Sequence, residues 1–125
     1  MRPQPQVFAI KGKLPSRNEV TAADRGNRYA ANRLKKSIQR TIILEAKAQK
    51  IRPVHGPVTV HIDWFEPNRR RDVDNIQSSA KLVLDALVSM GVLSGDGQKH
   101  VTDVTHEVHI DTYAPRVVVT IEEAE

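Results

Sequence analysis

The alternation of residues 58–65, VTVHIDWF, is the feature that most constrains how this chain can fold. One set of positions is apolar and comprises Val58, Val60, Ile62 and Trp64. The intervening set is polar and comprises Thr59, His61 and Asp63. Successive side chains of a β-strand point to opposite faces, so the pattern predicts a half-buried strand whose apolar face packs against a core.

Two longer segments repeat their apolar residues at helical spacing and predict helices. In residues 27–50 the repeat includes Leu34 and Ile38, with basic residues in much of the remainder. The second segment covers residues 74–90, and Gly91 follows it as a plausible C-terminal cap.

Three shorter runs predict further strands, at residues 7–13, 100–110 and 116–123. The last two are expected to form a hairpin joined by residues 111–115, DTYAP. The resulting order is β-α-β-α-β-β, which predicts an α+β fold with two helices packed on a mixed sheet. We expect it to form a single domain over residues 1–125.

The composition narrows the class of partner. The chain has 125 residues, a net charge of +4 and a sequence pI of about 9.6, a balance that favours a polyanionic partner. So small a chain leaves much of its surface exposed, and dimerisation would bury some of it. The chain has no cysteine, which excludes disulfides and thiolate-bound zinc. We expect a cytoplasmic protein without membrane association, because no stretch resembles a signal peptide or could span a bilayer.

A metal site is suggested by Asp72 and Asp74, which stand two residues apart where a turn enters the second predicted helix. Residues i and i+2 of an extended chain point the same way, so both carboxylates can reach one hard cation. Mg²⁺ prefers a few carboxylates together with water and substrate phosphate. The alternative is that these residues cap the helix or add surface charge, with Asn75 tuning its first turn.

Three neighbouring features favour the metal interpretation over capping. Three arginines, Arg69, Arg70 and Arg71, directly precede the two aspartates. Lys81 and Asp85 follow Asp74 by seven and eleven residues, close to its face on a continuous helix. Asp96 lies in a glycine-flanked loop and is a candidate third carboxylate. For Asp85 the alternative is an i,i+4 pair with Lys81 on the helix surface.

The stretch RRRDVDNIQ…LDALVSMGVLSGDGQ resembles the signature of RusA-type Holliday junction resolvases, which are common in prophages. The resemblance covers roughly residues 58–110, and residues 14–36 resemble the N-terminal half of phage members. It implies a homodimer that acts on four-way DNA junctions and makes paired nicks in opposed strands. It also implies that Asp72, Asp74 and Asp96 hold Mg²⁺ or Mn²⁺.

The sequence departs from the family pattern at one position. The best-known members carry a catalytic lysine one helical turn after the second aspartate, and this chain has Ser78 there. Lys81, three residues later, is the candidate replacement. Two alternatives therefore stay open beside the junction resolvase. One is a catalytically weak or inactive protein that binds branched DNA, and the other is a nuclease for other branched DNA.

Basic side chains are candidates for contacts with the DNA backbone, which supply affinity and salt dependence. They are Arg69, Arg70, Arg71, Arg33, Lys35, Lys36 and Lys99. The alternative for residues 33–36 is a solvated helix face. A zinc site is not expected among the five histidines, because the chain has no cysteine and no helical H-x-x-x-H motif. His106 and His109 are close in sequence, but a strand would turn them to opposite faces, so the histidines are interpreted as surface or hairpin residues.

Overall fold

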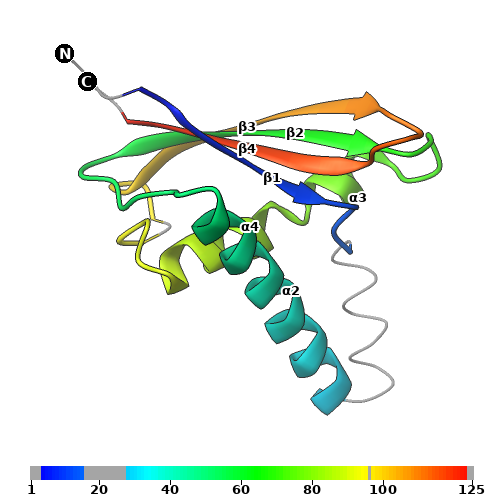
Figure 1. Cartoon of the computed structure of the whole chain (residues 1–125), viewed down its shortest axis with the longest axis horizontal. Helices are drawn as coiled ribbons and strands as arrows, with labels where there is room; N and C mark the ends of the chain where they lie inside the picture. The colour runs from blue at the N-terminus through cyan, green and yellow to red at the C-terminus, as the bar shows by residue number, and fades with distance from the viewer. Residues whose placement is uncertain (1–3, 16–27, 96, 124–125) are drawn as a thin grey trace.

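The computed structural model describes residues 4–15, 28–95 and 97–123. The elements follow one another along the chain (Figure 1) in the order β1 (Gln6–Lys11), α2 (Arg28–Ala48), β2 (Val58–Glu66), α3 (Val73–Gln77), α4 (Ala80–Ser89), β3 (Val101–Ile110) and β4 (Arg116–Glu123). Among the helices within these ranges, none is both long and apolar enough to cross a membrane.

The four strands form one mixed sheet in the order β1-β4-β2-β3. β4 is antiparallel to both β1 and β2, so β1 and β2 run parallel to each other with β4 inserted between them. β3 pairs with the other edge of β2 and is parallel to it. The first part of the chain is therefore a split β-α-β unit, and the predicted α+β class with a mixed sheet is confirmed.

The predicted hairpin between the last two strands is wrong. β3 and β4 flank β2 instead of pairing with each other. The connection at residues 111–115 crosses the end of β2, where the Asp111 amide donates to the Glu66 carbonyl over 2.8 Å. Five residues readily span the two strand spacings involved, which amount to roughly 10 Å.

The alternation of β2 places its apolar side chains in the core. Val58, Val60, Ile62 and Trp64 are all at most 1% exposed, as the sequence predicts. All three described helices lie against this one face of the sheet (Figure 1). They complete a core to which the other strands contribute mainly Phe8, Ile10, Val117, Val119 and Ile121.

The helix predicted near residues 27–50 is confirmed as α2. Its buried residues, Ala31, Ile38, Ile42 and Ala46, are separated by seven, four and four positions, which places them on a single face of the helix.

The second predicted helix is interrupted, and this break bears on the candidate site. α3 ends at Gln77 and α4 begins at Ala80. The Ser78 hydroxyl donates to the Asn75 carbonyl over 2.6 Å, and the buried Ser79 hydroxyl donates to the Pro15 carbonyl over 2.7 Å. Serine hydroxyls compete in this way with helical hydrogen bonding, and here they accompany a change between two helical segments.

Gly91 closes α4 as the sequence predicts. Its φ of +83° is in the left-handed region, where glycine carries no side-chain penalty. The Gly91 amide donates to the Val88 carbonyl and the Val92 amide to the Leu87 carbonyl. This pair of bonds is a Schellman cap, which satisfies carbonyls left open at the helix end.

Candidate active site

The turn after β2 is fixed by a buried ion pair. Glu66 is the last residue of β2, and its side chain is 4% exposed. The Arg71 guanidinium donates to both oxygens of the Glu66 carboxylate, from Nε to Oε1 over 2.9 Å and from Nη2 to Oε2 over 2.7 Å. The Arg71 Nη1 atom also donates to the Leu14 carbonyl over 2.9 Å. A bidentate pair of this kind has a defined geometry, so it fixes the chain just before Asp72.

The three arginines of the turn are therefore not equivalent. Arg69 and Arg70 are exposed, whereas the Arg71 side chain is only 13% exposed and is directed at protein groups. The sequence predicts phosphate contacts for all three. Arg71 has a structural role in the turn, because its guanidinium is engaged with Glu66 and Leu14.

Asp72 occupies the N-cap position of α3 but does not cap the helix with its side chain. Its backbone is extended, with φ −68° and ψ 151°, and its carboxylate makes no capping hydrogen bond. The Asp72 carbonyl accepts from the Ile76 amide over 3.1 Å, so only the main chain takes part in the helix. The structure therefore does not contain the side-chain cap that was the alternative to a metal ligand at Asp72.

Asp74 lies in the first turn of α3 and is exposed, as Asp72 is. The two side chains point the same way only if the backbone is extended at both residues. Extended backbone ends at Asp72, because Val73 begins the helix. The two carboxylates are still neighbours at the start of one short helix, beside an arginine-rich turn.

A hollow in the surface adjoins Asp72. It lies between the turn, α3 and the end of β3, and it is lined by Asn68, Arg69, Arg71, Asp72, Val73, Ile76, Val108 and Ile110. The turn and Asp72 supply its polar groups, and α3 and β3 supply apolar ones. The hollow thus combines a carboxylate with the exposed Arg69 side chain, which suits a cation and a phosphate together.

The predicted alignment of Lys81 with Asp74 assumed one continuous helix. The structure instead separates α3 from α4 at Ser78 and Ser79. The Lys81 Nζ atom lies 3.0 Å from the Asp85 Oδ1 atom, the i,i+4 pair that the sequence offered as the alternative. Both side chains are largely exposed.

Asp96, the candidate third carboxylate, lies outside the described residues. The flanking Gly95 is described, and a Cβ atom there would come within 2.7 Å of the His100 ring. Glycine therefore lets the loop backbone pack directly against His100.

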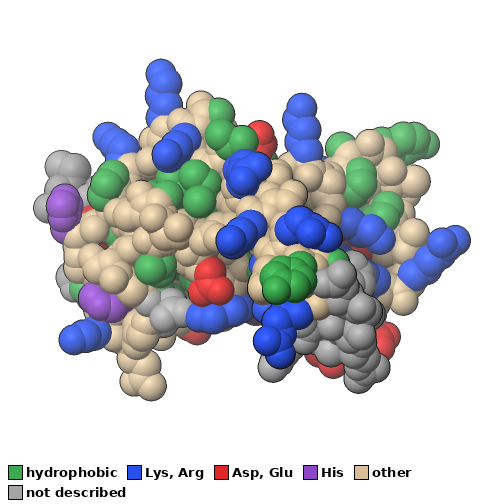
Figure 2. All heavy atoms as spheres, turned by 90° about the horizontal axis from the view of Figure 1, so that it is seen from below, with side chains coloured by type: hydrophobic (Ala, Val, Ile, Leu, Met, Phe, Trp, Pro, Cys, Tyr) green, Lys and Arg blue, Asp and Glu red, His purple; other side chains and the backbone are tan. Residues whose placement is uncertain are grey.

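The remaining basic candidates are exposed. They are Arg33, Lys35 and Lys36 on α2 and Lys99 in the turn before β3. Figure 2 shows the face that the helices cover, where Lys and Arg side chains are spread widely and acidic side chains are few. This distribution agrees with a polyanionic partner on that side of the molecule.

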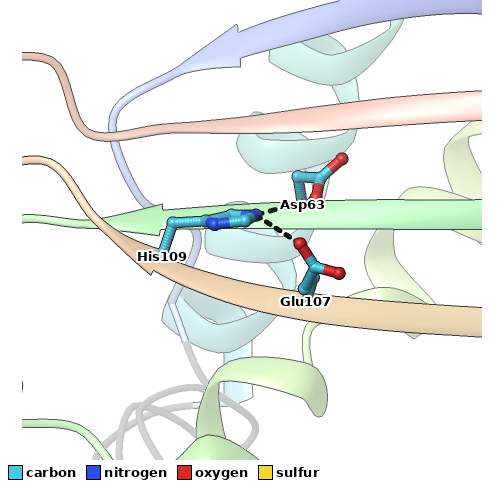
Figure 3. Close-up of side chains that lie close together, drawn as sticks. All are labelled: Asp63, Glu107 and His109. Carbon is cyan, nitrogen blue, oxygen red and sulfur yellow. Dashed lines mark hydrogen bonds and ion pairs between the residues drawn. The ribbon is translucent and has the colours of Figure 1, made fainter.

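A second cluster of polar side chains was not recognised from the sequence. Asp63, Glu107 and His109 meet on the sheet face opposite the helices (Figure 3), with their ligand atoms within 4.8 Å of one another. Asp63 and Glu107 are register partners on the parallel strands β2 and β3. The sequence signal is their position on the polar face of each strand, which becomes informative only once these strands are paired. His106 turns to the other face as expected, where its Nδ1 atom accepts from Trp64 Nε1 over 3.0 Å.

Exposed Lys and Arg side chains clustered on one face are the electrostatic footprint of a protein that binds nucleic acid. A sequence model of the family described as Endodeoxyribonuclease RusA matches residues 12–122, nearly the whole chain. The chain therefore belongs to the RusA endodeoxyribonuclease family, as its sequence resemblance predicts. No curated protein matches the chain.

Proposed function

We propose that this chain is a metal-dependent endodeoxyribonuclease that resolves four-way DNA junctions by paired nicks during recombination and repair. One observation carries the proposal beyond family membership. Asp72 and Asp74 are both exposed at the start of α3, and the Asp72 carboxylate makes no capping bond that would explain it structurally.

The chemistry of these donors fits a hard divalent cation. We propose that Asp72 and Asp74 hold Mg²⁺, or Mn²⁺ in its place, with Asp96 as the third carboxylate that the family resemblance implies. Such an ion, when bound, activates water, polarises the scissile phosphate and stabilises the leaving oxygen. The Glu66–Arg71 pair serves this site by holding the turn from which Asp72 projects.

The exposed basic residues are proposed to bind the DNA backbone. They are Arg69, Arg70, Arg33, Lys35, Lys36 and Lys99. Lys81 is a weaker candidate for a catalytic charge near the phosphate, because it lies beyond the helix break and pairs with Asp85.

Replacing Arg69 should weaken junction binding and its dependence on salt. Each lost phosphate contact lowers the log–log slope of affinity against salt concentration by roughly one unit. We expect this change for Arg69→Ala, measured by fluorescence anisotropy over a series of salt concentrations. Lys11→Ala is the matched control, because Lys11 is exposed on β1 near the uncovered sheet face. Equal slopes for Arg69→Ala and the wild type would assign Arg69 to a solvated turn.

We propose that the chain acts as a homodimer, since two opposed strands must be cut. Two large apolar side chains that line the hollow beside Asp72 are exposed, Val73 (54%) and Ile110 (45%). Burial of such a surface stabilises association. Light scattering at micromolar concentration should give the mass of two chains. A monomer that still makes paired nicks would contradict this proposal.

One observation favours a second candidate function. Ser78 stands where the best-known members carry lysine, and its hydroxyl is bonded to the Asn75 carbonyl. A protein without that charge could bind branched DNA and cut it slowly or not at all.

Substrate preference and activity can be tested together. A panel of labelled four-way junctions, three-way junctions, flaps and linear duplexes should be incubated with the protein and Mg²⁺. We expect paired cleavage of the four-way junction well above the others. Tight junction binding without cleavage would favour the second function, and preferred cleavage of flaps would redefine the substrate.

A further inference from the structure

Four donor atoms converge on the sheet face that the helices leave uncovered. The Nε2 atom of His109 lies 2.9 Å from Asp63 Oδ1 and 3.3 Å from Glu107 Oε2. The Nε2 atom of His61 lies 3.3 Å from the same Asp63 oxygen. The donors come from β2 and β3, two paired strands, so the backbone holds them at fixed separations (Figure 3).

Both imidazole rings are oriented by neighbouring groups. The His109 ring stacks on Phe65 with centroids 4.6 Å apart, and the Arg116 guanidinium covers that Phe65 ring at 3.8 Å. The His61 Nδ1 atom lies 2.6 Å from the Thr105 hydroxyl, which leaves its Nε2 atom directed at Asp63. In metal sites the second ring nitrogen commonly makes such a bond, which sets the tautomer and the direction of the ligating atom.

The cluster also concentrates negative charge around a shared centre. Two carboxylates face one imidazole nitrogen, so a single Nε2–H would have to serve both. Burial alone would raise the pKa of Asp63, but hydrogen bonds from His109 and His61 outweigh it and hold the pKa below its usual value. The arrangement thus favours the ionised form of Asp63.

We propose that Asp63, Glu107 and His109 bind one divalent transition-metal ion of the Zn²⁺ class, with His61 or water as a further ligand. Two carboxylate oxygens with imidazole nitrogen are a donor set that Zn²⁺ accepts, whereas Mg²⁺ prefers oxygen ligands alone. The ion would join β2 to β3 across the uncovered face and stabilise the sheet.

This site is separate from the candidate active site. Its residues point away from the helices, whereas Asp72 and Asp74 belong to α3 on the helix-covered side (Figure 1). The proposal therefore does not depend on the nuclease proposal, and the two can fail independently.

Isothermal titration of the metal-free full-length protein with ZnCl₂ tests the proposal, together with thermal unfolding with and without Zn²⁺. We expect one tight Zn²⁺ site per chain, which persists in Asp72→Asn, and a higher unfolding temperature. Glu107→Gln and His109→Gln should each weaken binding by about a hundredfold or more and remove the rise in unfolding temperature. Glu107 is 65% exposed, so Glu107→Gln is expected to fold normally.

Two controls separate this site from other zinc ligands. His55→Gln removes an exposed histidine outside the cluster, and Asp72→Asn removes a carboxylate of the candidate active site; both should retain full Zn²⁺ affinity. The proposal is overturned if the wild type does not bind Zn²⁺, or if Glu107→Gln and His109→Gln bind it as tightly as the wild type. It is likewise overturned if Asp72→Asn loses the binding instead.

Discussion

Asp72→Asn and Asp74→Asn should each lower the rate of four-way junction cleavage by at least about a hundredfold. Each substitution removes an anionic ligand from the proposed site while preserving the size of the side chain. Junction binding should persist, because the loss of a negative charge does not weaken contact with a polyanion. Gel-shift and single-turnover cleavage assays on the same preparation measure the two effects separately.

Asp103→Asn provides the matched control for this pair. Asp103 is exposed on β3, and the register pairs it with Thr59 on the polar face of β2. The substitution makes the same chemical change on the sheet face opposite the helices, so cleavage should continue at the wild-type rate. A variant of Asp72 or Asp74 that cuts as fast as Asp103→Asn would remove that aspartate from the site.

Breaking the ion pair between Glu66 and Arg71 should destabilise the fold by about 3 kcal/mol or more. Glu66→Ala leaves the guanidinium of Arg71 with little solvent and without its carboxylate partner. Arg71→Ala leaves the Glu66 carboxylate, which is 4% exposed, without its bidentate donor. Urea unfolding followed by circular dichroism gives the change in free energy of unfolding for each variant.

A double-mutant cycle separates the pair from its surroundings. The double variant Glu66→Ala/Arg71→Ala should lose less stability than the two single variants added together, because it leaves no unpaired charge. Lys81→Ala is the control for an exposed pair, where we expect a change of about 0.5 kcal/mol or less. Additive losses in the cycle would contradict the assignment of Arg71 as a structural anchor.

Elements set by local periodicity could be predicted from the sequence. The alternation of Val58 to Trp64 identified β2 and its buried face, and the spacing of Ile38 and Ile42 identified the buried face of α2. Gly91 marked a helix end because its left-handed backbone is a local requirement of the Schellman cap. The carboxylates at the start of α3 were recognised because Asp72 and Asp74 stand two residues apart in one short sequence motif.

Features that depend on distant contacts could not be predicted. The position of β4 between β1 and β2 is set by pairing between strands that are distant in sequence. The sequence alone favours a hairpin between β3 and β4, because these two strands are adjacent along the chain. The break before α4 involves Ser79 and Pro15, which are 64 residues apart.

Chemical roles that depend on tertiary partners were also hidden in the sequence. Arg71 looks identical to its two neighbours in sequence, and only the buried Glu66 distinguishes it. The cluster of Asp63 with Glu107 and His109 exists only in the parallel register of β2 and β3. A local pattern shows which residues share a face of one strand, but not which strand lies beside it.

Cleavage of an end-labelled four-way junction by the wild-type protein, with Mg²⁺ and with excess EDTA, tests the proposed function most directly. We predict paired nicks on opposed strands with Mg²⁺, no product with EDTA, and recovery of cleavage when Mg²⁺ is restored. Cleavage at the same rate in EDTA would contradict the metal-dependent mechanism. A bound junction left intact in both Mg²⁺ and Mn²⁺ would contradict the nuclease assignment itself.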